Sequence, residues 1–74
     1  MERYKNLGGN SEVRAYEIGE DSLIVQFSDG WNYVYTNRSA GRYIEKMKVL
    51  AIAGQGLNSF IKLNVRFNYS KKYR

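Results

Sequence analysis

The sequence of 74 residues contains no cysteine and no histidine. Without cysteine, the chain can form neither a disulfide framework nor a thiolate metal site. Without histidine, it lacks the commonest general base and the commonest metal ligand. No pairing of lysine, tyrosine, serine and carboxylate side chains stands out as catalytic. We therefore expect no catalytic residue, no metal site and no cofactor, and a protein that is not an enzyme.

Long apolar segments are also missing. No run approaches the roughly 18 residues that a membrane span needs, and the opening MERYKNLGGN lacks the apolar stretch of a signal peptide. We expect a soluble, cytoplasmic protein with no membrane partner. The length suits one domain, residues 1–74, of modest stability. The paired glycines near the start and the basic SKKYR at the end predict flexible ends at residues 1–10 and 70–74.

Charge is distributed unevenly along the chain. Residues 1–37 carry three Lys or Arg against six Asp or Glu, a net charge of −3, whereas residues 38–74 carry nine Lys or Arg against Glu45 alone, a net charge of +8. The formal net charge of the whole chain is +5. A basic half of this kind favours RNA or another polyanion as a partner, and solubility alone is the competing explanation.

The segments SLIVQF (22–27) and WNYVYT (31–36) flank a turn and predict a β-hairpin. A two-residue loop at Asp29-Gly30 would scatter the apolar residues over both faces. A three-residue loop that includes Ser28 collects them on one face and gives Gly30 the positive φ that a type I turn with a bulge needs. We therefore predict three facing pairs: Leu23 with Tyr35, Val25 with Tyr33, and Phe27 with Trp31.

The aromatic row Trp31, Tyr33 and Tyr35 has two interpretations, a core face or a surface on which a ligand stacks. Its continuity with the aliphatic side chains of the neighbouring strand favours the core. EVRAYEI (12–18) alternates weakly and predicts a strand before the hairpin. Together the three segments predict a three-stranded antiparallel β-meander.

Residues 39–53, SAGRYIEKMKVLAIA, predict a long helix that Ser39 caps and Gly54 ends. At 100° per residue, one face of this helix collects a core-facing stripe: Ala40, Tyr43, Ile44, Met47, Leu50 and Ala51. Val49 and Ile52 fall outside the stripe. We expect the C-terminal tail to cover them; the alternative is a contact with another chain.

The segment IKLNVRFNY (61–69) leaves two structures open. Its apolar and polar residues alternate, which favours a strand. A helix would instead use the spacing of Leu57, Phe60, Ile61 and Val65, with Asn58 as its cap. Periodicity alone does not decide between them.

The hairpin resembles the KTSC domain, a module of about 60 residues named for the C-terminus of some lysyl-tRNA synthetases. The family pattern L-x-V-x-F-x-[ND]-G-x-x-Y-x-Y is matched by Leu23, Val25, Phe27, Asp29, Gly30, Tyr33 and Tyr35. The later pattern G-x-x-F-N-x-x-I-R is similar to GQGLNSFIK, which matches it at Gly54, Asn58 and Ile61 and has Leu57 for the aromatic residue and Lys62 for Arg. Ser11 and Val13 match an earlier Ser-x-[IV]. The resemblance implies a small α+β unit with a meander followed by helices, favours helix in the tail, and implies RNA binding without catalytic residues.

We thus expect an α+β domain: a three-stranded antiparallel β-meander followed by one long and one short helix packed on one sheet face. The function we expect is a non-catalytic binding module for RNA, with candidate contacts from the basic half: Arg38, Arg42, Lys46, Lys62, Arg66, Tyr69, Lys71 and Lys72. The alternative is a protein-interaction or small assembly subunit, as a homodimer or with another protein, that uses Val49, Ile52 and a sheet edge.

Overall fold

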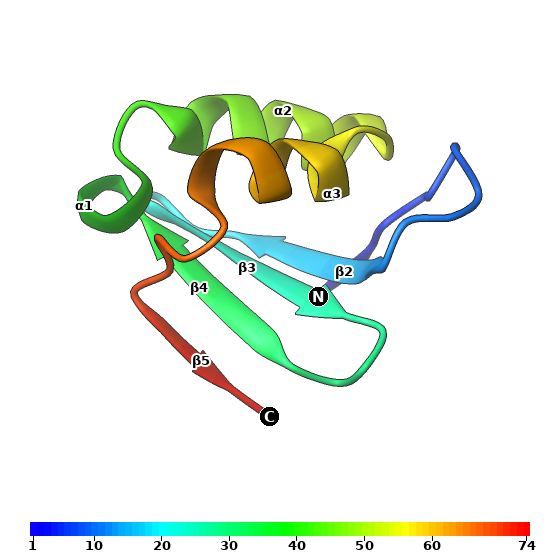
Figure 1. Cartoon of the computed structure of the whole chain (residues 1–74), viewed down its shortest axis with the longest axis horizontal. Helices are drawn as coiled ribbons and strands as arrows, with labels where there is room; N and C mark the ends of the chain where they lie inside the picture. The colour runs from blue at the N-terminus through cyan, green and yellow to red at the C-terminus, as the bar shows by residue number, and fades with distance from the viewer.

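The computed structural model describes all 74 residues and has an α+β fold built on one antiparallel sheet (Figure 1). The sheet has five strands in chain order, not the three of the predicted meander. The strands are β1 (Glu2–Arg3), β2 (Val13–Ile18), β3 (Ser22–Phe27), β4 (Asn32–Thr36) and β5 (Lys71–Tyr73). The three central strands are those expected from the sequence. The two added edges come from the end segments that were expected to be flexible.

The β3–β4 hairpin has the predicted register. Leu23 pairs with Tyr35 and Val25 with Tyr33, and the Phe27 amide donates to the Trp31 carbonyl at 2.9 Å. Gly30 has φ +94°, the left-handed conformation that the three-residue loop requires. The hydrophobic pattern and the turn chemistry therefore fix the same register.

The predicted helix 39–53 is divided in two, α1 (Asn37–Ala40) and α2 (Tyr43–Ala53), by Gly41 at φ +58°. The prediction that Ser39 is the N-cap of this helix was wrong. Thr36 caps α1 by accepting from the Ser39 amide at 3.0 Å, and the Ser39 hydroxyl accepts from the Thr36 amide at 2.9 Å. This reciprocal pair is a capping box with Ser39 in its third position. Gly54 ends α2 in the left-handed conformation, as predicted.

The tail is helical where the sequence left two structures open. α3 (Leu57–Phe60) runs directly into η1 (Ile61–Val65), a π-helical turn, and the chain then returns to the sheet as β5. Gly56, not Asn58, is the cap residue of α3. The helical alternative wins because Leu57, Ile61 and Val65, which are at most 4% exposed, all point into the core. A strand would have placed Leu63 and Phe67 on the same face as Ile61 and Val65, but they are 84% and 75% exposed, which excludes the strand.

The core lies between the sheet and the helices, which all cover one sheet face (Figure 1). Leu23, Val25 and Met47 are fully buried there, and Ile44 and Ala51 confirm the predicted stripe of α2. Val49 and Ile52 are each 57% exposed, so the expectation that the tail covers them was wrong. The tail packs on the other side of α2, where α3 and η1 lie beside it. None of the helices is long and apolar enough to cross a membrane.

Candidate functional site

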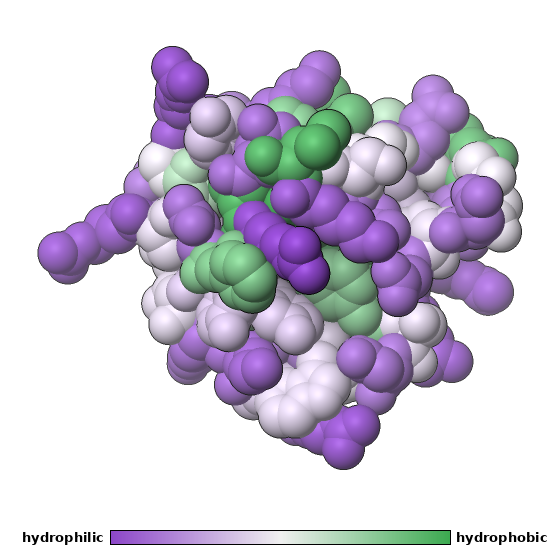
Figure 2. All heavy atoms as spheres, viewed as in Figure 1, coloured by the Kyte–Doolittle hydropathy of each residue, from purple (hydrophilic) through white to green (hydrophobic).

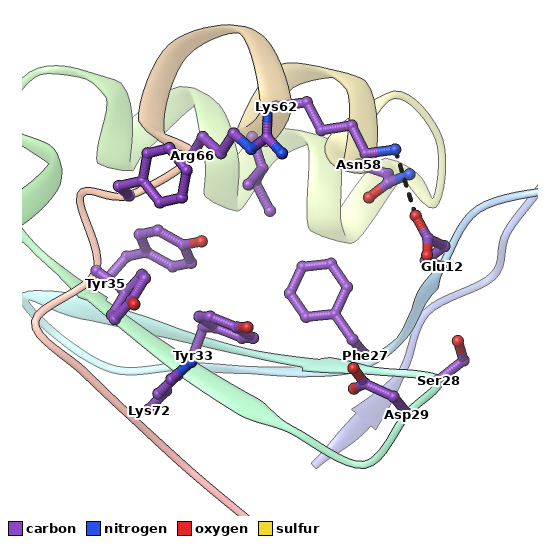
Figure 3. A pocket seen from close by; sticks show the side chains of 13 residues that line it. Glu12, Phe27, Ser28, Asp29, Tyr33, Tyr35, Asn58, Lys62, Arg66 and Lys72 are labelled. Carbon is purple, nitrogen blue, oxygen red and sulfur yellow. Dashed lines mark ion pairs between the residues drawn. The ribbon is translucent and has the colours of Figure 1, made fainter.

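A pocket of about 360 Å³ opens between the α3–η1 helix and the β3–β4 hairpin (Figure 3). Its walls come from four separate parts of the chain: the start of β2, the hairpin, α3–η1 and the C-terminal strand. The lining residues are Glu12, Phe27, Ser28, Asp29, Tyr33, Tyr35, Asn58, Ile61, Lys62, Arg66, Phe67, Tyr69 and Lys72. On the same face of the molecule, strongly hydrophilic side chains are interleaved with apolar and aromatic ones (Figure 2).

Aromatic rings form the sheet side of the pocket. The Phe27 and Tyr33 rings meet edge to face, with centroids 5.2 Å apart, and Tyr69 packs on Tyr33 in the same way at 5.0 Å. Tyr35 is 1% exposed, whereas Tyr33 and Phe27 are half-buried. The aromatic row thus divides along β4: Tyr35 belongs to the core, and Tyr33 presents ring surface to the pocket.

The helix side of the pocket is polar and cationic because a polar or basic residue recurs there at every fourth position. Asn58, Lys62 and Arg66 follow one another at this interval along α3–η1, and all three line the pocket. An i→i+5 turn takes more residues than an α-turn, so residues four apart lie nearly above one another in η1. Ile61 and Val65 share the same interval and are buried in the core. One helix therefore packs on the sheet and presents two cations to the pocket, with Lys62 directed to Glu12 (Figure 3).

Lys72 brings a third cation to the pocket from β5. Lys72 pairs with Tyr33 across the sheet, so both side chains lie on the helix-covered face. Its ammonium lies 5.1 Å from the ring centre of Trp31, 5.8 Å from that of Tyr33 and 5.9 Å from that of Tyr69. Cation–π attraction to three rings holds the charge in place without neutralising it.

The hairpin end of the pocket is acidic. Glu12 pairs with Lys62 at 3.3 Å, and both side chains are exposed, so this ion pair contributes little to stability. Asp29 forms no ion pair; its Oδ1 accepts from the Trp31 amide at 3.0 Å, and its Oδ2 has no hydrogen-bond donor. The pocket is therefore bipolar, with one free carboxylate at the hairpin and cations at the helix and the edge strand.

Burial raises the pKa of Tyr35 well above its ordinary value, and the neighbouring phenols of Tyr33 and Tyr69 add to the rise. A neutral Tyr35 at physiological pH leaves the cations and the two carboxylates as the charges of the pocket. The pocket thus keeps an uncharged, aromatic inner wall.

The structure divides the basic residues predicted as a nucleic-acid surface. Lys62, Arg66, Lys72 and Tyr69 come together in the pocket. Arg38 lies at a separate polar hollow beside α1, and Lys46 is exposed on α2. Lys71 pairs with Val34, so its side chain lies on the sheet face that no helix covers.

Arg42 is also outside the pocket, with its guanidinium 5.3 Å from the Tyr43 ring centre. A hydrogen bond from Arg42 to the Tyr43 hydroxyl, at 3.4 Å, raises the pKa of Arg42 above its ordinary value. Arg42 therefore stays charged but has no part in the pocket.

The prediction of site residues missed the non-basic half of the pocket. The hairpin pattern predicts Phe27 and Tyr33 as core residues, and Asn58 is predicted as the cap of the helical alternative for the tail. The sequence did contain a signal for these pocket residues. The residues that match the KTSC hairpin pattern line the pocket, except for the buried Leu23 and Val25 and the turn glycine. Together with the later pattern, the matching positions supply six of its 13 lining residues, namely Phe27, Asp29, Tyr33, Tyr35, Asn58 and Ile61, and Lys62 stands where that pattern has Arg.

A second surface lies on the far side of α2. Val49 and Ile52 are exposed there, and Ile52 borders a hollow with Met1, Tyr16 and Ile18 beside β1. Elsewhere, no three carboxylates come close enough together to hold a metal ion.

Comparisons of the chain with models of protein families, with curated proteins and with solved structures gave no match.

Proposed function

We propose that this protein is a non-catalytic binding module for single-stranded RNA and that its pocket receives one unpaired base. The observation that carries the proposal is the meeting of Lys62, Arg66 and Lys72 with the Tyr33 and Tyr69 rings in one pocket. Cations supply the phosphate contacts that dominate nucleic-acid affinity. Exposed rings stack unpaired bases, at about 1–3 kcal/mol per base.

The resemblance to the KTSC domain supports the same assignment, and we propose membership of that family. The two matched patterns lie far apart in the sequence, at residues 23–35 and 54–62. They converge on this pocket, which is what a shared binding site would require. The departure at Lys62, where the family has Arg, exchanges a bidentate phosphate contact for a point charge.

A salt titration tests the proposal. With three phosphate contacts, log Kd for a short uridine oligonucleotide should change by about 2 per tenfold change in salt, because each contact on single strands contributes roughly 0.7 to the slope. Fluorescence anisotropy of a labelled pentauridine, measured at several salt concentrations, gives this slope. Binding that is absent at low salt, or present without salt dependence, would refute the proposal.

Matched variants separate the pocket from the overall charge. Lys62→Gln and Lys46→Gln each remove one positive charge, but only Lys62 lines the pocket. We expect Lys62→Gln to reduce the salt slope by about 0.7 and Lys46→Gln to leave it nearly unchanged. Glu12→Gln should act in the opposite direction and strengthen binding, because it frees Lys62 from its ion pair. Equal effects of the two lysine variants would indicate unspecific attraction to a basic protein.

A second candidate function is a protein contact or homodimer through the far side of α2. Val49 and Ile52 favour it, since both aliphatic side chains are 57% exposed on α2 and Ile52 borders the hollow beside β1. Sedimentation at increasing protein concentration tests self-association. A strict monomer at high concentration would exclude the homodimer, and unchanged RNA binding by Val49→Ser with Ile52→Ser would separate the two surfaces.

A further inference from the structure

We propose that the hairpin end of the pocket selects guanine over the other three bases; this inference rests on the proposed function. The charges of the pocket are ordered, with Arg66 on the helix side, Asp29 at the hairpin and the Phe27 ring between them (Figure 3). A nucleotide has the same order, since a phosphate and the hydrogen-bonding edge of the base lie at opposite ends of a flat ring. Cations facing the phosphate therefore direct the base edge towards Asp29.

Asp29 is available to a ligand. Its Oδ1 accepts one hydrogen bond from the Trp31 amide at 3.0 Å, which holds the carboxylate in place. Its Oδ2 accepts none, and no Lys or Arg forms an ion pair with the carboxylate; the Arg74 guanidinium donates to the Asp29 backbone carbonyl instead, at 3.2 Å. Glu12, the other carboxylate of the pocket, is already paired with Lys62. The free acceptor of this end is thus a single fixed carboxylate.

A carboxylate accepts hydrogen bonds and donates none, so it favours a base edge with two adjacent donors. Among the four RNA bases, guanine alone has this edge, formed by N1–H and the exocyclic N2 amino group. Uracil places carbonyl oxygens on both sides of its single N–H donor, and these repel a carboxylate. Adenine and cytosine each offer one amino donor beside an acceptor nitrogen. Direct reading of base edges is the usual basis of sequence preference on single strands.

Labelled pentanucleotides measure the preference directly. Anisotropy titrations would compare UUGUU, UUUUU and a strand with inosine, which lacks the N2 amino group, in the central position. We expect UUGUU to bind about tenfold more tightly than UUUUU, a typical discrimination for one bidentate pair. The inosine strand should lose most of this gain.

Asp29→Asn tests the assigned residue with little disturbance of the turn. Its amide oxygen can still accept from the Trp31 amide, but its charge and its second acceptor are lost. We expect the guanine preference to vanish while pentauridine binding stays equal or strengthens. Glu20→Gln is the matched control, because it removes an exposed carboxylate that does not line the pocket. A guanine preference that survives Asp29→Asn would overturn the inference.

The outcomes also separate this inference from the proposed function. Salt-dependent binding of all strands with equal affinity would refute guanine selection and leave RNA binding intact. Absence of binding to every strand would refute both. Free GMP is a further probe. GMP affinity equal to that of UUGUU would support guanine recognition and contradict a single strand as the natural ligand. Much weaker binding of GMP than of UUGUU would support both guanine recognition and a single-stranded ligand.

Discussion

Gly54 is the position at which replacing glycine by alanine should disturb the packing of the fold most. It is buried, has φ +79° and ends α2. A Cβ atom built on Gly54 would lie 2.5 Å from the Cβ of Lys5, a distance at which one of the two must move. The Lys5 Cβ is attached to the backbone, so a rotation of the Lys5 side chain cannot relieve the contact. The segment after β1 would have to shift.

That segment is tied to the rest of the fold on both sides of Lys5. The Leu7 amide donates to the Gly54 carbonyl at 2.8 Å. Tyr4 is 3% exposed, and its hydroxyl accepts from the Leu57 amide at 3.3 Å at the start of α3. A shift of Lys5 therefore weakens contacts to both the end of α2 and the start of α3.

Gly56 supplies the matched comparison for Gly54→Ala. It has φ +84°, so alanine carries the same left-handed strain, but its added Cβ would meet nothing closer than Leu50 Cδ2 at 3.5 Å. The strain costs about 1–2 kcal/mol in either variant. Forcing an atom into packed surroundings adds roughly 1–3 kcal/mol at Gly54 alone. The entropy that alanine removes from the unfolded chain is equal in the two variants and cancels.

Urea denaturation, followed by the fluorescence of the single tryptophan, measures the difference. We expect Gly54→Ala to be less stable than Gly56→Ala by about 1–3 kcal/mol. Lys5→Gly should restore most of the difference in the double variant because it removes the clashing Cβ. Lys5→Ala retains the Cβ and should not. Equal stability of Gly54→Ala and Gly56→Ala, or equal rescue by both Lys5 variants, would refute this account.

Three further predictions concern a helix cap, alkaline stability and the edge strand. Thr36→Ala should lower the free energy of unfolding by about 1 kcal/mol through loss of the capping box, as urea denaturation can show. The raised pKa of Tyr35 means that its contribution to stability is complete below the unfolded pKa of about 10 and is lost as pH rises above it. Between pH 8 and 11, stability should therefore fall more steeply in the native protein than in Tyr35→Phe. Finally, replacing Lys72 and Arg74 by Gln uncovers the Trp31 ring, which both cations now contact, and should shift its fluorescence to longer wavelength.

The hairpin was predictable from the sequence because two independent signals agree there. The alternation of apolar residues and the positive φ available to Gly30 both require the three-residue loop. The division of the long helix was less accessible. Gly41 stands two residues after Ser39 in a sequence that otherwise keeps its helical period, and the capping box at Thr36 begins three residues before the expected helix.

The tail shows where periodicity fails as evidence. Residues 61–69 satisfy a period of two as well as a helical spacing, and what decides between them is the exposure of Leu63 and Phe67, which a strand would have buried beside Ile61 and Val65. β5 was missed for a different reason. Its three residues are all exposed, so no apolar pattern marks it, and it forms by pairing with the free edge of β4.

The pocket was hidden from sequence reasoning for a related physical reason. Tyr33 and Tyr35 occupy equivalent positions in the alternation of β4 and both border the pocket, yet Tyr35 is buried in the core at its inner wall whereas Tyr33 is only half-buried. The difference lies in what covers them, because α3–η1 packs closely over Tyr35 and leaves the Tyr33 ring to meet Tyr69 and Lys72. These partners lie more than 30 residues further along the chain. A β-strand pattern defines which side chains share a face, but the extent of the covering helix decides where that face stops being core and becomes a binding surface.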